Sequence, residues 1–157
     1  MKNVLYILLL SLLVTGCSVL GQGWRNFNAY YNTFYNAKQF YNDGEREIKR
    51  QQPDVSQLEL IQIFPKPVNT GSENFQEAIN RGSGILRNHE GSKFVNRAIL
   101  IIGKSYFYRS EFFSALEKFQ ELQILTEGEF QQEAIFWQVR TFYQLNNDEA
   151  GISLLEN

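Results

Sequence analysis

Residues 98–119, AILIIGKSYFYRSEFFSALEKF, decide the fold of this chain. Apolar residues recur every three or four positions on both sides of Ser110, which is the pattern of two amphipathic helices joined by a short turn. Serine is a residue type that caps helix starts, so we expect helices over residues 93–109 and 111–125. Helices joined by so few residues must pack antiparallel, which predicts a helical hairpin.

The same hairpin recurs along the chain. A shift of 36 residues places residues 98–119 on residues 134–155, and a period in the thirties with two helices per unit indicates a solenoid. In the second unit Gln138 and Val139 replace an apolar residue and a glycine, so we expect a degenerate repeat. A generic helical bundle is the alternative. The residues of the first unit with the spacing of a tetratricopeptide repeat core are Ile99, Ile102, Gly103, Tyr106, Ala115 and Phe119.

Residues 24–157 as a whole are predicted to form a helical repeat domain. Residues 24–51 are expected to be one long aromatic helix that packs on the next hairpin, although Asp43-Gly44 could kink it or end it early. Prolines and a mixed pattern over residues 52–72 predict an extended strap, and residues 73–157 hold the hairpins. The packed face of the long helix is predicted at positions 24, 27, 31, 34, 38 and 41. The later helices are predicted to start at Asn74, Ser92, Ser110, Thr126 and Asn146.

The predicted fold class is therefore all-α, with antiparallel hairpins of tetratricopeptide type stacked as a short right-handed solenoid. The last helix is expected to carry an uncovered apolar face formed by Ile152, Leu154 and Leu155.

The first residues predict a targeting segment. Residues 4–14 form an eleven-residue apolar run, which is too short to cross a bilayer because a spanning helix takes about 20 residues. The run ends in residues 14–17, VTGC, which have the order of a bacterial lipobox. We expect residues 1–16 to be a lipoprotein signal peptide, Cys17 to be the acylated first residue and residues 17–23 to be a lipidated tether. A plain secretory signal is the alternative.

Composition and the residues after Cys17 narrow the setting. Ser18 takes the place of the aspartate that retains many lipoproteins at the inner membrane, so we expect an outer-membrane anchor that faces the periplasm. A net charge of −2 creates no positive electrostatic field that would attract nucleic acid. One cysteine with one histidine cannot build a zinc site. The sequence contains no nucleophile motif and no phosphate-binding loop, and its one histidine, His89, lies in a polar turn. We therefore expect no enzyme, no cofactor and no metal.

The first helix of each hairpin is predicted to line a concave side. Its inward positions are Arg97, Leu100, Lys104, Phe107 and Tyr108, together with their counterparts Glu133, Phe136, Arg140, Tyr143 and Gln144. Three of these ten residues are basic and four are aromatic, on a chain of negative net charge. This predicts a partner-binding groove for an extended or C-terminal segment that carries carboxylates. The alternative is that the rings pack on the neighbouring hairpin. The groove residues are Arg97, Lys104, Phe107, Tyr108, Phe136, Arg140 and Tyr143.

Several motifs together point to one family. Besides the lipobox they are YYNTFYNAKQF (30–40), NFQEAINRGSGIL (74–86), the hairpin sequence AILIIGKSYFYRSEFFSALEKF (98–119) and EAIFWQVRTFYQLNNDEA (133–150). The arrangement resembles the N-terminal part of the tetratricopeptide lipoproteins of gliding motility and type IX secretion in Bacteroidota, the PorW/SprE type. The resemblance implies a lipid-anchored adaptor that binds envelope proteins. Members of that family are much longer, so we expect a fragment or a short paralogue.

Two other functions remain open at this point. One is a BamD-like role in outer-membrane protein assembly, and gene neighbours would separate it from secretion or gliding. The other is a cell-wall enzyme or a sugar-binding protein that uses the rings of residues 24–41, which a peptidoglycan pull-down would address.

Overall fold

The computed structural model describes residues 21, 23, 24, 26, 27, 33–51 and 70–156. These residues contain no strand, and none of their helices is long and apolar enough to span a bilayer. The predicted all-α class is confirmed. The helices are α2 (Tyr35–Gln51), α3 (Ser72–Asn88), α4 (Val95–Tyr108), α5 (Phe112–Leu125), α6 (Glu129–Gln144) and α7 (Asp148–Glu156).

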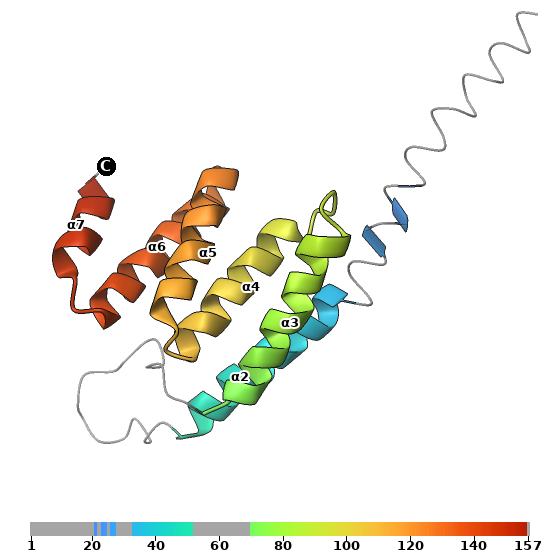
Figure 1. The fold of residues 1–157 in the computed structure, drawn as a ribbon, viewed down its shortest axis with the longest axis horizontal. Coiled ribbons are helices and arrows are strands. Elements are labelled where there is room, and N and C mark those ends of the chain that lie inside the picture. Colours follow the sequence, from blue (N-terminus) through green and yellow to red (C-terminus); the bar gives the residue numbers. More distant parts are fainter. Residues whose placement is uncertain (1–20, 22, 25, 28–32, 52–69, 157) are drawn as a thin grey trace, which may run out of the picture.

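Each helix packs against the one that follows it in the chain. Figure 1 shows α2, α4 and α6 running in one direction and α3, α5 and α7 returning in the other. Helix α2 also contacts α4, and α4 contacts α6, so these three helices are neighbours in space. One end of the array therefore carries the α3–α4 and α5–α6 turns, and the opposite end carries the α4–α5 and α6–α7 turns.

The hairpin of α4 and α5 packs as its sequence predicts. A Cβ atom on Gly103 would lie 2.6 Å from Cε1 of Phe119, so the absence of a side chain lets the two helices approach. Ala115 is fully buried at the same crossing. Of the six predicted core residues, five are buried, and Tyr106 is half-buried against them.

A second close approach joins α2 to α3, although many residues separate them in the sequence. A Cβ atom on Gly44 would lie 2.8 Å from the ring of Phe75. Gly71, with φ of 74°, brings the start of α3 against the backbone of Gly44. Helix α2 continues through Gly44 to Gln51, so the early end that Asp43-Gly44 could have caused does not occur. The predicted strap lies almost wholly outside the described residues.

The packed face of the aromatic helix differs from the prediction. Phe34 and Tyr41 are buried, but Trp24 is 66% exposed and Phe27 is 51% exposed. Ala37 is buried in place of Lys38, which is exposed. The buried stripe steps by three residues from Phe34 to Ala37 and then by four to Tyr41, where the prediction had four and then three. Both orders keep one helical face, because 3.6 residues make one turn, so only the position between Phe34 and Tyr41 differs. The buried positions are therefore Phe34, Ala37, Tyr41, Gly44 and Ile48.

The predicted starts of α3 and α6 are wrong. Helix α3 begins after Gly71, and the amide of Asn74 donates a 2.8 Å hydrogen bond to Glu47 of α2 instead of capping a helix. Helix α6 begins after Gly128, while the hydroxyl of Thr126 donates back to the carbonyl of Leu122. Side chains that can cap a helix are thus used for other contacts.

The other three helix starts are closer to the prediction. Ser110 has φ of 62° and forms the turn, and Glu111 directly precedes α5. Ser92 accepts a hydrogen bond from the N–H of Phe94 just before α4. Asn147, one residue after the predicted Asn146, accepts the N–H of Ala150 at the start of α7.

Candidate functional site

The predicted groove residues lie on α4 and α6, and α2 continues the same side of the molecule. Arg97 and Lys104 are seven residues apart on α4, which places them two turns apart on one face. Lys104 contacts Glu133 of α6, and Arg97 shares a pocket with Lys38 of α2. We call this side of α2, α4 and α6 the groove side. It brings together residues from three helices that are distant in the sequence.

Two of the predicted groove residues are in the core. Phe107 is 0% exposed and Tyr108 is 1% exposed, so the prediction that they face a partner is wrong. Phe107 lies edge-to-face against Trp137 of α6, with ring centroids 5.3 Å apart, and Tyr108 stacks on Phe75 of α3 at 5.3 Å. Leu100, predicted to point inward, is also buried. These rings pack on neighbouring hairpins, which is the alternative that the sequence left open.

Lys104 is already paired within the chain. Its Nζ lies 2.5 Å from Oε1 of Glu133 and 5.1 Å from the ring centroid of Trp137. The lysine side chain is 16% exposed and the glutamate side chain 35% exposed. This contact neutralises one of the three predicted cations and joins α4 to α6.

Arg140 is held among aromatic rings. Its guanidinium carbon lies 4.3 Å from the ring centroid of Trp137, 5.0 Å from that of Phe107 and 5.7 Å from that of Phe136. Arginine commonly stacks on ring faces in this way. Phe136 and Tyr143 remain 41% and 68% exposed. At α6 the groove side therefore offers mainly aromatic surface.

Two buried tyrosines connect the groove side to the core. The hydroxyl of Tyr41 donates a 2.5 Å hydrogen bond to Oε1 of Glu45, one turn later on α2. Burial raises the pKa of Tyr41 well above its usual value, and the nearby Tyr108 and Glu45 raise it further. Burial also raises the pKa of Tyr108, with Glu45 adding to the effect and Arg140 opposing it. Both phenols stay protonated at neutral pH, and both rings pack on Phe75 of α3.

A pocket between α2 and α4 carries the free positive charge of the groove side. It has a volume of about 360 Å³ and is lined by Phe34, Tyr35, Lys38, Gln39, Asn42 and Arg97. Among the described residues, neither Lys38 nor Arg97 has an ion-pair partner. Within the same part of the chain, the side-chain amides of Gln39 and Asn42 donate and accept no hydrogen bond. We call this the α2/α4 pocket.

Of the cations in the α2/α4 pocket, the sequence indicated only Arg97. Lys38 was assigned to the packed face of α2, so its role was missed. The helical positions i and i+4 shared by Lys38 and Asn42 could have indicated a polar ridge beside the buried one. The sequence alone could not predict that this ridge lies next to Arg97, because α3 and residues 52–69 separate α2 from α4 along the chain.

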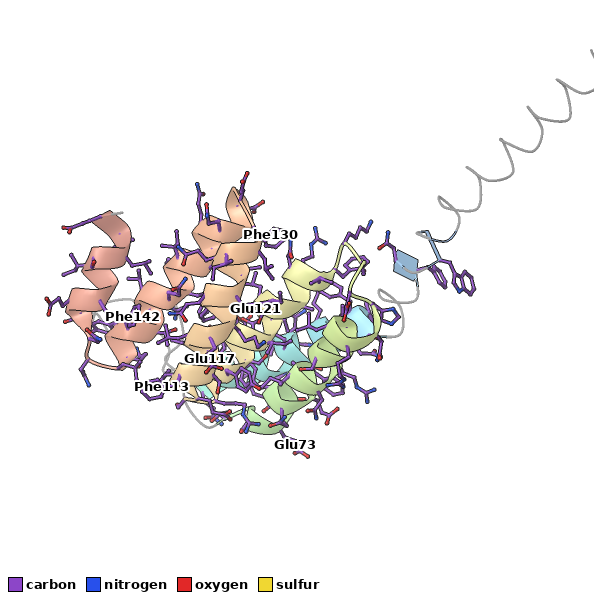
Figure 2. All side chains as sticks on the ribbon, turned by 45° about the horizontal axis from the view of Figure 1, so that its top comes forward. Glu73, Phe113, Glu117, Glu121, Phe130 and Phe142 are labelled. Carbon is purple, nitrogen blue, oxygen red and sulfur yellow. The ribbon has the colours of Figure 1, made fainter. Side chains whose placement is uncertain are left out.

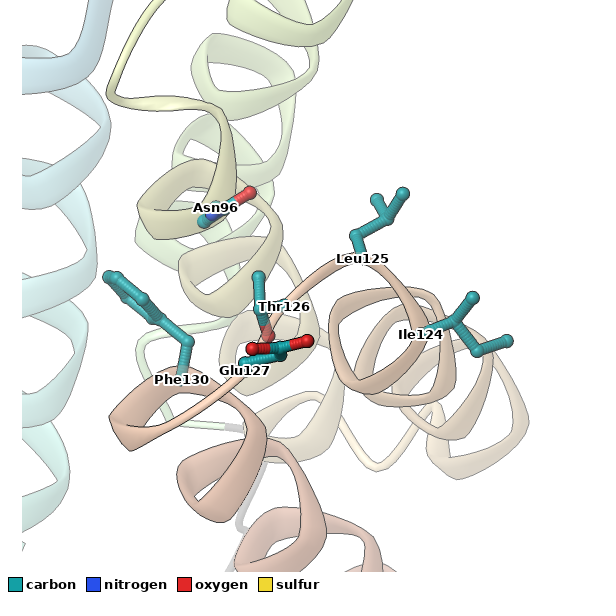
Figure 3. Close-up of a pocket in the computed structure, with 6 residues that line it drawn as sticks. All are labelled: Asn96, Ile124, Leu125, Thr126, Glu127 and Phe130. Atoms are coloured by element: carbon teal, nitrogen blue, oxygen red, sulfur yellow. The ribbon is translucent and has the colours of Figure 1, made fainter.

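A larger pocket lies at the α5–α6 turn. It has a volume of about 450 Å³, and Figure 3 shows its lining residues Asn96, Ile124, Leu125, Thr126, Glu127 and Phe130. Its only charged lining residue is Glu127, which gives it less capacity for specific polar recognition than the α2/α4 pocket. Within residues 33–51 and 70–156 no group of His, Cys, Asp and Glu side chains could hold a metal ion. Cys17 lies outside the described residues.

The α2/α4 pocket can bind an anion by charge and by amide hydrogen bonds, and the exposed rings of α6 can add apolar contact. Comparison with known proteins adds no relative, because no protein-family model, curated protein or solved structure matches this chain.

Proposed function

We propose that this protein is a lipid-anchored adaptor of the bacterial cell envelope that binds an extended acidic segment of another envelope protein on its groove side. The observation that carries the proposal is the α2/α4 pocket, which both Lys38 and Arg97 line. Among the described residues, no carboxylate forms an ion pair with either side chain. Two neighbouring cations that lack ion-pair partners, on a chain of net charge −2, favour a ligand that supplies carboxylates.

The architecture that we propose is a short right-handed solenoid of tetratricopeptide-type hairpins. The Gly103–Phe119 crossing and the common direction of α2, α4 and α6 support it. Such stacks present extended concave binding surfaces. The lipobox suggests anchoring through an acylated Cys17 in the outer membrane, facing the periplasm. The resemblance to the PorW/SprE type suggests secretion or gliding machinery as the setting.

The two parts of the groove side define the ligand more closely. Packed helices lie about 8–10 Å apart, so the α2/α4 pocket and α6 are separated by about one and a half such spacings. An extended chain advances about 3.3 Å per residue, so about four residues of ligand span that distance. We therefore expect an acidic residue over Lys38 and Arg97 and an apolar residue about four or five positions away on Phe136. Tyr143 lies two turns further along α6, so a ligand reaches it only several residues later.

A charge reversal tests the proposal. In the variant Lys38→Glu with Arg97→Glu, recovery of partners by affinity purification from envelope membranes should fall strongly. The matched control is Arg50→Glu with Arg81→Glu, which makes the same charge change at exposed positions of α2 and α3 outside the pocket. Far-ultraviolet circular dichroism and the melting temperature establish that both variants are folded.

The outcome is read by mass spectrometry of the recovered proteins. The proposal predicts that the control keeps the partners that the pocket variant loses, and that added salt weakens binding of the unaltered protein. A folded pocket variant that retains the full set of partners would overturn the proposal. Lys104 and Arg140 are unsuitable for this test, because reversing either charge disturbs the contacts with Glu133 and with the rings.

A further inference from the structure

Two aromatic side chains near the start of the described chain are exposed to solvent. Trp24 and Phe27 are 66% and 51% exposed. Their rings are stacked, with centroids 5.9 Å apart and planes 17° apart. A pair of large exposed rings outside the core is typical of a surface that binds a membrane, a ligand or another protein. We call Trp24 and Phe27 the aromatic pair.

A hydrogen bond ties the segment that carries the aromatic pair to the helical body. The N–H of Lys93, in the α3–α4 turn, donates a 3.2 Å hydrogen bond to Oδ1 of Asn26, which lies between the two rings in the sequence. The pair is therefore placed at the end of the array that carries the α3–α4 turn (Figure 1). Exposed charges in and beside that turn are Arg87, Glu90 and Lys93, two positive and one negative.

The distance to the proposed lipid anchor is short. Seven residues lead from Cys17 to Trp24. Even a fully extended chain spans at most about 3.5 Å per residue, so Trp24 cannot be more than about 25 Å from an acylated Cys17. Tryptophan and other aromatic rings are favoured at the level of the lipid headgroups, where an apolar body and a polar edge are both satisfied.

We infer that Trp24 and Phe27 insert into the interfacial layer of the membrane and set the α3–α4 end of the molecule against the lipid surface. The inference rests on the proposed lipid anchor. Arg87 and Lys93 add attraction for anionic headgroups, which Glu90 partly offsets. Ile124 and Leu125, exposed at the neighbouring α5–α6 turn, are not included because Glu127 and Glu129 lie beside them.

This contact would orient the groove side. Helix α4 runs from the membrane end to the α4–α5 turn, and its 14 residues span about 21 Å at 1.5 Å per residue. Phe113, labelled in Figure 2, follows that turn and is 75% exposed at the far end. The axes of α2, α4 and α6 then run away from the membrane, and a ligand that crosses them lies along its surface.

Quenching of tryptophan fluorescence tests the inference. The chain has two tryptophans, and Trp137 is 5% exposed in the core. The full acylated protein is purified from membranes and reconstituted into phosphatidylethanolamine–phosphatidylglycerol vesicles, with bromine near the headgroup end of some acyl chains. Emission of the unaltered protein should fall and shift to shorter wavelength. The variant Trp24→Phe, which retains Trp137 alone, should lose this response.

A second variant is the matched control for exposure. Phe113→Trp in the Trp24→Phe background places an exposed indole at the far end, where brominated lipid should leave its emission unchanged. Mass spectrometry of the N-terminal peptide reports acylation of Cys17 separately. If Cys17 carries lipid and Trp24 is not quenched, the membrane contact is wrong and the anchor stands. If Cys17 carries no lipid, both are overturned. Equal quenching of Trp24 and of an indole at position 113 would also overturn the proposed orientation.

Discussion

Gly103→Ala should destabilise the protein, although alanine is the better helix former. The added Cβ would lie 2.6, 2.9 and 3.1 Å from Cε1, Cδ1 and Cζ of Phe119. The ring has no room to move aside, because Phe119 is 0% exposed and stacks on Trp137 with centroids 5.8 Å apart. The methyl group therefore has to push α4 and α5 apart or displace a ring of the core.

The size of the effect follows from two opposing contributions. Replacing a glycine within a helix by alanine stabilises the folded state by about 1 kcal/mol. Overpacking a core costs about 1–3 kcal/mol, and a contact this short with an immobilised ring belongs in the upper part of that range. We expect a net loss of about 1–2 kcal/mol in the free energy of unfolding. At about 2–4 °C per kcal/mol for a chain of this length, the melting temperature should fall by about 2–8 °C.

Gly151→Ala is the matched control. Gly151 lies within α7, and the nearest atoms to its added Cβ, on Phe142 and Val139, are 3.7 Å away, which is ordinary contact. Here only the helix-propensity gain remains, so stability should rise by up to about 1 kcal/mol. Urea unfolding followed by far-ultraviolet circular dichroism measures both changes. The two variants should shift the midpoint in opposite directions.

A double-mutant cycle identifies the cause. If the ring of Phe119 is the obstacle, Gly103→Ala should cost less in a Phe119→Leu background, with a coupling energy of about 0.5–3 kcal/mol. The reasoning is refuted if Gly103→Ala stabilises the protein as much as Gly151→Ala does, or if the cost is the same in both backgrounds.

Two further predictions concern the polar contacts of the groove side. Because the pKa of Tyr41 is raised in the folded state, the folded chain keeps a proton that the unfolded chain loses above about pH 10, so stability should fall as the pH rises through that range. Urea midpoints measured from about pH 9 to about pH 11 should show a shallower fall for Tyr41→Phe, and an unchanged slope would contradict this assignment. Lys104→Met should lower the free energy of unfolding by about 1 kcal/mol, since the partly buried Glu133 then loses its cation. A cycle with Glu133→Gln should give a coupling energy of about 0.5–1 kcal/mol, and a value near zero would mean that the 2.5 Å contact contributes nothing.

Local pattern was sufficient for the helices and for the packing within one hairpin. Periodicity predicted helices, with short connections after residue 88, and the structure confirms both for the residues that it describes. The spacing of Gly103, Ala115 and Phe119 also predicted which residues meet between α4 and α5. Such predictions succeed because a short turn leaves two amphipathic helices only one way to cover their apolar faces.

Tertiary packing decided which faces of those helices remain free. Helix α2 packs against α3 and also contacts α4, although residues 52–69 and α3 separate it from them in the sequence, and in this packing Ala37 rather than Lys38 is buried. The side chains of Asn74 and Thr126 could each cap a helix, but their observed hydrogen bonds go to Glu47 and to the carbonyl of Leu122. Local propensity cannot rank these choices, because the competing partner lies on another helix or depends on where a helix ends.

The groove side shows the same division most clearly. The sequence by itself determined that Arg97, Lys104 and Arg140 share the spacing of inward-facing positions. Only the tertiary structure paired Lys104 with Glu133, enclosed Arg140 in rings and left Arg97 beside Lys38. A helical period specifies the direction in which a side chain points, but whether its charge is neutralised, stacked or free depends on the neighbouring helix that it meets.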